Sequence, residues 1–381
     1  MQSYTDVLVA GAGPTGLAAA LFLASRNCGV RIIDKLEKPA PNSRAQVINP
    51  RSLELLEPSG VTAMLLEAGR PFRGVRFYDG WSDLAELAFD DIHPRFPMLA
   101  LPQAHTEAIL TEAVTSLGID VERGRELVTF AQTDDAVQAD IRSGAGHEDI
   151  EARLLLAADG SHSATRERLG LGFEGSSYPE IWPLYDIELD TPLDTEHAHV
   201  SFVHGGLVFF LAIGSGTWRV FGNVPEPLQF LPKGSRAGEV SWQSDFHVSH
   251  RIVERESVGR IVLAGDAAHI HSPVAARGMN LGIEDAAAFA DAAARTLNGQ
   301  ADAIETYARA RHAIHKSVVA RIERLTFAGR GRPDFVGVLR QFVLPAMVHV
   351  RPIAHMMLDL VTGLDHPAPP MPRPEAVTGK S

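Results

Sequence analysis

A Gly-x-Gly-x-x-Gly turn at residues 11–16 limits what this chain can fold into more than any other part of it. The apolar run 7–10, which follows Asp6, precedes the turn, an Ala/Leu-rich segment at 17–26 follows it, and a second β-branched run ends at Asp34. This is the order of strand, turn, helix and strand in a βαβ unit that binds a dinucleotide. The stretch therefore predicts a Rossmann-like α/β fold built around a bound nucleotide.

The three glycines of this turn have separate physical roles. Gly11 permits the tight turn, Gly13 lets the backbone approach a pyrophosphate, and Gly16 lets the helix pack closely on the strands. The first N–H groups of the helix would then face the phosphates. Asp34 can accept hydrogen bonds from a ribose but would repel a 2′-phosphate, which favours FAD or NAD over NADP. The neighbouring candidates for cofactor binding are Pro14, Thr15 and Lys35.

Two other interpretations of this stretch are a glycine-rich turn of an ordinary α/β protein and a secretory signal peptide. A signal peptide needs a positive segment before its apolar run, and the only charged side chain there is Asp6. The 381 residues suffice for two domains, and the net charge of −12 disfavours nucleic acid as a partner. No apolar run reaches the roughly 20 residues that span a bilayer, so we expect a soluble, cytoplasmic protein. The single cysteine, Cys28, excludes internal disulfides and is expected to be a small buried hydrophobe.

Two later segments each combine a buried strand with an acidic turn. The first is a largely apolar run at 150–158 that ends in Asp159-Gly160, after which Ser163 is placed to cap a short helix carrying Arg166. Carboxylates at the ends of such strands lie where open α/β sheets bind ligands, although an Asp-Gly turn is common by itself. The second segment runs through Gly265, Asp266 and Pro273 to Gly278, Met279 and Asn280 at the start of an Ala-rich helix.

Together these signatures resemble the flavoprotein aromatic hydroxylases, which are class A FAD monooxygenases of the para-hydroxybenzoate hydroxylase type. The order and spacing of the three matches cover residues 1 to about 300. The resemblance implies FAD as the bound cofactor and NADH or NADPH as a transient electron donor. The sequence contains no second Gly-x-Gly-x-x-Gly unit for the electron donor, which fits transient binding.

The resemblance also implies roles for individual residues. Asp34 would bind the FAD ribose, and Arg44 and Gln103 would contact the FAD. The motif from Asp159-Gly160 to Arg166 would serve both FAD and NAD(P)H. The remaining implied contacts are those of Asp266 with the ribityl chain and of the loop from Pro273 to Gly278, Met279 and Asn280 with the isoalloxazine ring.

The chain departs from the family at residues 275–278, which read Ala-Ala-Arg-Gly in place of Gly-Gly-Gln-Gly. We expect the methyl groups of Ala275 and Ala276 to narrow the approach to the flavin. We expect Arg277 to favour the anionic reduced flavin.

The predicted fold class is α/β, with a Rossmann-like FAD-binding domain, an inserted antiparallel β-sheet substrate domain and C-terminal helices. Short strands separated by glycine turns at 178–224 indicate an antiparallel meander in the insert. The predicted segments are 1–74, 98–177 and 255–330 for the FAD-binding domain with a long helix, 75–97 and 178–254 for the substrate domain, 331–365 for C-terminal helices, and 366–381 for a proline-rich disordered tail.

The implied activity is that of an FAD-dependent NAD(P)H monooxygenase. NAD(P)H would reduce the flavin, O2 would add at C4a, and the hydroperoxide would transfer one oxygen atom to an aromatic or polyketide-like substrate. Water must be kept out because the hydroperoxide otherwise decays. Aromatic residues of the meander can line such a cavity, although most are expected to be core. Because neighbouring residues of a strand point to opposite faces, at most one of Phe209 and Phe210 should meet the substrate.

A base or cation near a phenol would help, because a phenolate is the better nucleophile. The candidates are Tyr185, His204, Arg219 and His247, with Arg44 and Pro273 as further catalytic candidates beside the flavin. Any one of these side chains is more often structural than functional. His269 and His271 flank the proline loop, but no metal site is expected because no carboxylate or cysteine completes one.

Other functions remain open at this point. A flavin-dependent reductase of the geranylgeranyl-reductase type would share the fold and use no oxygen, and a non-catalytic flavin-binding protein would not turn over. A flavin-dependent halogenase is disfavoured because its Trp-x-Trp-x-Ile-Pro segment does not occur. The expected partners are a small aromatic substrate and O2, and a homodimer is left open.

Overall fold

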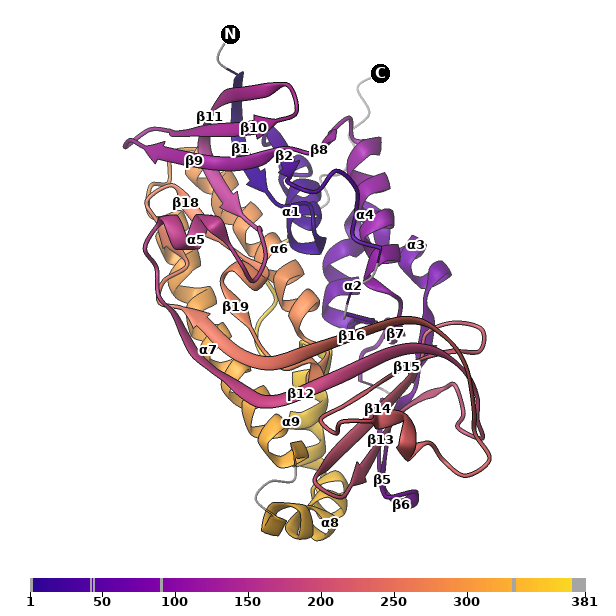
Figure 1. Ribbon diagram of the computed structural model, residues 1–381. Helices are drawn as coiled ribbons and strands as arrows, with labels where there is room; N and C mark the ends of the chain where they lie inside the picture. Colours follow the sequence, from indigo (N-terminus) through magenta and orange to yellow (C-terminus); the bar gives the residue numbers. More distant parts are fainter. Residues whose placement is uncertain (1–2, 42, 44, 90–91, 331–333, 372–381) are drawn as a thin grey trace, which may run out of the picture.

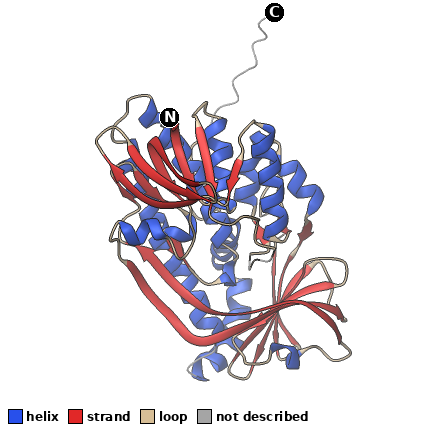
Figure 2. Ribbon diagram, turned by 45° about the horizontal axis from the view of Figure 1, so that its top comes forward, coloured by secondary structure: helices blue, strands red, loops and turns tan. Residues whose placement is uncertain are grey.

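The computed structural model describes residues 3–371 apart from 42, 44, 90–91 and 331–333. The chain begins with β1 (Ser3–Ala10), α1 (Pro14–Ala24) and β2 (Val30–Asp34), and β1 pairs in parallel with β2. The predicted strand, turn, helix and strand are thus present in the predicted order. Two large β-sheets and a group of helices make up most of the described chain (Figures 1 and 2).

The first sheet carries the nucleotide-binding signatures. Its other strands are β8 (Val121–Arg123), β9 (Glu126–Gln132), β10 (Val137–Ser143), β11 (Gly146–Ala157), β17 (Ser257–Val258) and β18 (Ile261–Leu263). The strand order is β17-β18-β11-β1-β2-β8, and β9 and β10 form a hairpin on β11. Because β1, β11 and β18 are parallel, their C-terminal ends meet at one edge of the sheet, and Gly11, Ala158 and Gly265 lie just beyond them.

Residues of β1 alternate between the two faces of this sheet. Val7 and Val9 belong to a core built with helices, whereas Leu8 and Ala10 pack with the β9–β10 hairpin. Both faces are therefore buried, which explains why the strand is a continuous apolar run. The helices of this half are α2 (Pro50–Leu56), α3 (Val61–Ala68), α4 (Gln103–Ser116), α5 (Ala164–Arg168) and α6 (Gly278–Leu297).

The second sheet is mainly antiparallel. Its strands are β5 (Gly74–Asp79), β6 (Ser82–Ala88), β12 (Phe173–Asp190), β13 (His197–Val203), β14 (Gly206–Ala212), β15 (Thr217–Gly222), β16 (Arg236–Val253) and β19 (His269–Ile270). Their order is β19-β16-β12-β15-β14-β13-β5-β6, and only β13 and β5 are parallel neighbours. A third sheet contains β3 (Val47–Ile48), β4 (Arg70–Phe72) and β7 (Met98–Ala100), and short 3-10 helices are η1 (Glu57–Ser59), η2 (Pro227–Phe230), η3 (Gly265–Ala267) and η4 (Pro273–Ala275).

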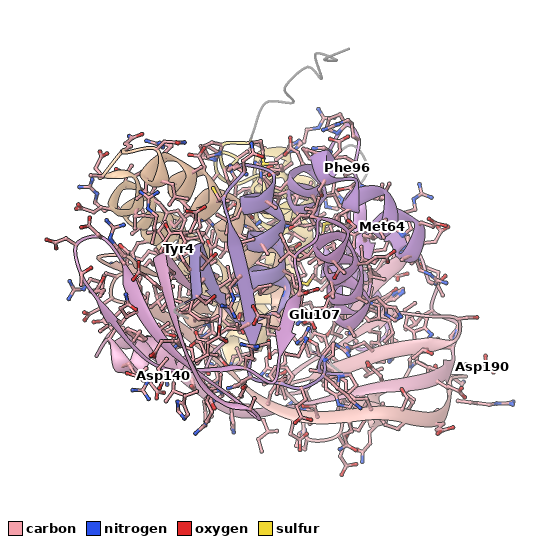
Figure 3. All side chains as sticks on the ribbon, turned by 90° about the horizontal axis from the view of Figure 1, so that it is seen from above. Tyr4, Met64, Phe96, Glu107, Asp140 and Asp190 are labelled. Carbon is pink, nitrogen blue, oxygen red and sulfur yellow. The ribbon has the colours of Figure 1, made fainter. Side chains whose placement is uncertain are left out.

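Two long strands, β12 and β16, connect the two halves of the molecule. They pair antiparallel from Phe173 and Val253 near the first sheet to Asp190 and Arg236 at the far end, and they arch across the molecule (Figure 1). Asp190 lies on the opposite side of the molecule from Asp140 of β10 (Figure 3). The sequence predicts the last part of β12 as a strand of the meander, but it does not predict β16.

The C-terminal part is helical, with α7 (Ala303–Arg330), α8 (Asp334–His349) and α9 (Arg351–Thr362). The prediction of a disordered tail from residue 366 is wrong for residues 366–371, because Arg26 donates a 2.9 Å hydrogen bond to the carbonyl oxygen of Pro370 and Met371 packs against the helical core. Cys28 is buried, as predicted. Within the described residues, we find no helix with the length and apolar character to cross a membrane.

Candidate active site

A cavity of about 1070 Å³ lies where the two halves meet, and both halves supply its lining. The first half contributes Gly13, Gly160 and Asp266, and the second contributes Phe209 and Trp242. Segments from many parts of the sequence therefore face one continuous space.

The N-terminus of α1 forms one end of this cavity. Gly13 is the N-cap of α1 and has no side-chain cap among the described residues, and Gly13, Pro14 and Thr15 line the cavity. A β-carbon on Gly11 or Gly16 would collide with a carbonyl oxygen, whereas one on Gly13 would meet nothing within 4 Å. Gly11 and Gly16 thus serve close packing, and the N–H groups beyond Gly13 face open space of the kind that a pyrophosphate fills.

Asp34 stabilises the backbone of the glycine turn through hydrogen bonds. Its Oδ2 accepts a 2.7 Å hydrogen bond from the backbone N–H of Ala12, and its Oδ1 accepts one of 2.8 Å from that of Leu36. The structure does not bring Asp34 or Lys35 to the cavity wall, and Lys35 is exposed. For these two residues the predicted contact with the nucleotide stays a prediction.

The second signature is tightly ordered at the next strand end. Ser163 caps α5, as predicted, by accepting a hydrogen bond from the N–H of Arg166. Oδ2 of Asp159 accepts hydrogen bonds from the N–H and hydroxyl of Thr165, while its buried Oδ1 has no partner among the described residues. Gly160 and Arg166 line the cavity, and burial lowers the pKa of the Arg166 guanidinium, which donates to the carbonyl oxygen of Ala267.

The third signature brings Asp266, Pro273, Gly278 and Met279 to the cavity. The preceding residue, Gly265, has φ of +60° and would place a β-carbon 2.5 Å from the hydroxyl of Thr15. Glycine is therefore required where β18 gives way to the acidic turn. Helix α6 begins at Gly278, and its first N–H groups, like those of α1, have no side-chain cap among the described residues.

Asn280 differs from its neighbours because its side chain faces the protein. Its amide donates to the carbonyl oxygens of Val47 and Ala276, and its Oδ1 accepts from the N–H of Asn49 and the hydroxyl of Ser52. Asn280 therefore ties the start of α6 to the loop before α2.

The structure corrects two expectations about residues 275–277. Ala276 lines the cavity, with φ of +52°, but Ala275 is buried against Leu281 and Val318 on the other side. Arg277 is 0% exposed and does not line the cavity, because Nη2 is 3.3 Å from Glu284 and 3.4 Å from Asp365. Ala275 therefore does not narrow the approach, and Arg277 does not line the loop beside the flavin. Its charge still helps to lower the pKa of His271 in the cavity wall, so its effect on a flavin anion stays a prediction.

Gln103 lies on the cavity wall, as the first residue of α4. Its Oε1 accepts a 2.6 Å hydrogen bond from the hydroxyl of Ser43, and its Nε2 donates to Glu107, whose pKa is raised by burial. Arg44 lies outside the described residues, although its neighbours Ser43 and Ala45 line the cavity.

The second sheet supplies the other wall. Arg219 lines the cavity, pairs with both carboxylate oxygens of Asp186 at 2.7 Å, and donates to the carbonyl oxygen of Ser43. His247 also lines the cavity, whereas the structure brings neither Tyr185 nor His204 to it. Tyr185 packs on the other face of the sheet, and His204 is exposed between β13 and β14.

Aromatic side chains cover much of this wall. Phe209 lines the cavity and Phe210 is buried in a separate cluster, so the two side chains lie on opposite faces of the sheet, as the alternation predicts, and contact of Phe209 with the substrate stays a prediction. Sequence reasoning missed Trp242, Ser244 and Phe246. All three belong to β16, whose exposed, polar first half gives no strand signal.

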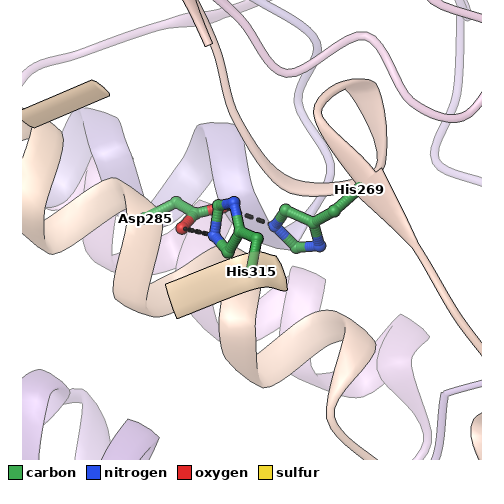
Figure 4. A group of neighbouring side chains, drawn as sticks. All are labelled: His269, Asp285 and His315. Carbon is green, nitrogen blue, oxygen red and sulfur yellow. Dashed lines mark hydrogen bonds and ion pairs between the residues drawn. The ribbon is translucent and has the colours of Figure 1, made fainter. Parts of the chain in front are cut away.

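His271 and His269 have different surroundings. His271 lines the cavity, and desolvation lowers its pKa to about 3, so this imidazole is neutral. The expectation that no carboxylate approaches His269 is wrong, because Asp285 accepts a 2.7 Å hydrogen bond from His269 and a second from His315 (Figure 4).

Comparison with known proteins identifies the family. The model of a protein family described as "FAD binding domain" matches residues 4–210 and 230–322 of this chain. The chain is 36% identical over 330 residues to 6-methylpretetramide 4-monooxygenase of Streptomyces rimosus, covering 80% of this chain and 59% of that protein. It is 32% identical over 335 residues to rifampicin monooxygenase of Streptomyces venezuelae, covering 82% and 69%. The chain thus spans less than two thirds of the first of these relatives.

Solved structures agree on the fold. The crystal structure of p-nitrophenol 4-monooxygenase from Pseudomonas putida matches with a TM-score of 0.85 at 20% identity, covering 95% of this chain and 99% of that one. At this identity the match supports the α/β fold class alone. The sequence relatives and the family match go further: this chain belongs to the FAD binding domain family, and its predicted kinship with the flavoprotein aromatic hydroxylases is confirmed.

Proposed function

We propose that this chain is an FAD-dependent monooxygenase that hydroxylates an aromatic or polyketide-like small molecule with NAD(P)H and O2. One observation carries the proposal. Two helix N-termini and the Asp266 turn share a single cavity with an aromatic wall from the second sheet. The two relatives are named as monooxygenases of 6-methylpretetramide and rifampicin, which supports oxygen insertion into an organic molecule.

The residues present fit FAD. The uncapped N-terminus of α1 suits the pyrophosphate. The buried Oδ1 of Asp159 has no partner among the described residues and lies next in the chain to Gly160 of the cavity wall, although Asp159 does not itself line the cavity. Asp266 and the loop from Pro273 to Gly278 would hold the ribityl chain and the ring system. When bound, FAD supplies the electron transfer and the activation of O2.

The second sheet would position the substrate and exclude water. Phe209, Phe221 and Trp242 provide flat apolar surfaces for an aromatic ring, and such a lining excludes water. His247 is the candidate to accept a proton from a substrate hydroxyl through its imidazole nitrogen. Arg219 is held by Asp186, so we assign it to positioning the Ser43 loop.

Further parts of the proposal follow from the same chemistry. The proposed domain boundaries place the substrate domain at 75–97 and 178–254 and the FAD-binding domain at 1–74, 98–177 and 255–330. A cytoplasmic location is part of the proposal, because the reaction consumes NAD(P)H.

The test is oxidation of NADH or NADPH in air by the purified yellow protein, with a panel of phenols, hydroxypyridines and polycyclic quinols. Mass spectrometry should detect a product that carries one atom from ¹⁸O2. A flavin-dependent reductase would act equally under nitrogen, and a binding protein would not turn over.

A matched pair of histidine variants tests the substrate wall. His247→Gln should lower coupled product and change the pH profile of turnover, whereas His204→Gln should behave like the unmodified protein, because His204 lies away from the cavity. Equal profiles for both variants would remove His247 from the mechanism.

A further inference from the structure

A fully buried carboxylate, Asp285 on α6, accepts four hydrogen bonds behind the FAD cavity. Its Oδ2 accepts from the backbone N–H of Gly265 at 3.0 Å and from Nε2 of His269 at 2.7 Å. Its Oδ1 accepts from Nε of Arg311 and Nε2 of His315, both at 2.7 Å. Figure 4 shows Asp285 between the two imidazoles. A carboxylate with so many donors is held in one position.

Two of these donors belong to the turn that carries Asp266. Gly265 stands at its beginning and His269 at its end, so one carboxylate fixes both ends of residues 265–269. Asp266 lies between them and faces the cavity. The carboxylate at 285 therefore sets where Asp266 meets the cofactor, although Asp285 does not itself line the cavity.

The other two donors supply positive charge from α7. His315 donates from both ring nitrogens, from Nε2 to Asp285 and from Nδ1 to Glu256 at 2.5 Å. Because carboxylates only accept, the ring must carry both protons. Burial opposes this charge, but Asp285 and Glu256 raise the pKa of His315 to about 9. Arg311 adds a second cation, which also lies 3.7 Å from the buried carboxylate of Glu284.

These side chains have the spacing of a metal site, but their chemistry is different. Donor atoms of His269, Asp285 and His315 lie within 4.8 Å of one another. A metal ligand must offer a lone pair, and both nitrogens of His315 are occupied by protons. Arg311 already neutralises Asp285 from the same side. The chemistry of the arrangement is therefore that of an ion network and not of a metal site.

We propose that Asp285 is a positioning residue of the FAD site, which holds the 265–269 turn in the conformation that binds FAD, with Arg311 and His315 as its counter-charges. The proposal goes beyond the proposed function. It depends on FAD binding and not on hydroxylation, so it can be tested even if no substrate is found.

The test compares Asp285→Asn with Asp291→Asn by titrating FAD into the apoproteins. Both carboxylates lie on α6, but Asp291 is paired at the surface with Arg295. An amide carries no charge and has one acceptor oxygen, so in Asp285→Asn either the turn or α7 faces N–H groups, and any bond that remains to the turn has a neutral acceptor. The expected rise in the dissociation constant of FAD is about 10- to 100-fold. Asp291→Asn should bind FAD like the unmodified protein.

Two further readouts separate positioning from general stability. The visible circular dichroism of bound FAD should change in Asp285→Asn, because the asymmetric surroundings of the flavin change. If Asp285→Asn does not fold, His315→Gln keeps the carboxylate and removes one counter-charge, and it should weaken FAD binding by a smaller factor. FAD affinity and dichroism equal to those of Asp291→Asn, with only a lower melting temperature, would overturn the proposal.

Discussion

The charge on His315 predicts a specific dependence of stability on pH. In the folded protein, Asp285 and Glu256 raise the pKa of this histidine to about 9 against burial, whereas an unfolded chain has the ordinary value of about 6.5. The difference between these values corresponds to about 3 kcal/mol of stability. The side chain is 0% exposed, so solvent does not screen this interaction.

The sign follows from which state holds the proton. Below about pH 6.5 both states hold it, and the full contribution to stability is present. Between about pH 6.5 and 9 only the folded state holds it, so the contribution falls as the pH rises. Above about pH 9 the folded protein loses the proton as well, and the contribution is gone.

Urea unfolding of the unmodified protein and of His315→Gln measures this contribution together with its coupling to Asp285, Glu256 and His269, because titrating groups away from His315 cancel in the difference. The advantage of the unmodified protein should shrink by about 3 kcal/mol between about pH 6 and pH 9.5. Urea is preferable to guanidinium because it adds no salt. His105→Gln, at an exposed position of α4, should show no such change. An advantage of the same size at both pH values would refute the assignment of a doubly protonated His315.

Three further predictions concern the cavity. Phe210→Ala should lower the free energy of unfolding by about 3–5 kcal/mol, as measured by urea unfolding. Phe209→Ala should lower that free energy by less, and in product assays it should raise the KM for substrate or lower the fraction of NAD(P)H oxidation that yields product. Ala276→Gly should stabilise the protein by about 1 kcal/mol, because glycine adopts the left-handed conformation of residue 276 without strain. Ala275→Gly should destabilise the protein by about 1–2 kcal/mol, because it removes a buried methyl group. Melting temperatures that shift in the same direction for both variants would contradict this prediction. Asp266→Ala should raise the dissociation constant of FAD about tenfold or more, and an unchanged titration would exclude its contact with the cofactor.

The nucleotide-binding half could be predicted because its signals are local. Each signature consists of an apolar strand, a glycine turn and a helix start within a few residues, and the turn chemistry itself demands those residues. Gly265, for example, needs a positive φ, and a β-carbon there would approach Thr15. The alternation that separates Phe209 from Phe210 is also local.

The missed features depend on contacts between distant segments. β16 finds its partner β12 about 60 residues earlier, and most of its first half is exposed, so no apolar alternation marks it. The network of Asp285 forms only when α6 packs on α7. One signal was present: Glu284 and Asp285 interrupt an Ala-rich helix, while Arg311 and His315 lie one turn apart on another.

The direction of side chains in a loop was equally beyond the sequence. Residues 275–277 are consecutive, yet only Ala276 faces the cavity. Ala275 and Arg277 face away, where Arg277 meets Glu284 and Asp365. A substitution pattern relative to a family therefore indicates that a loop has changed, but the backbone conformation decides which of the changes the ligand meets.

The paired strands β12 and β16 have a mechanical consequence. They cross from one half of the molecule to the other as a hydrogen-bonded ribbon, from the pair Phe173 and Val253 to the pair Asp190 and Arg236, with interruptions of the pairing that include residues 178–180. The hydrogen bonds run across the ribbon and hold the two strands side by side, so a motion of one half relative to the other must bend both strands together. A paired ribbon resists bending more than a single strand does, and the interruption of its pairing between Ser177 and Ile181 is the place where it would bend most easily.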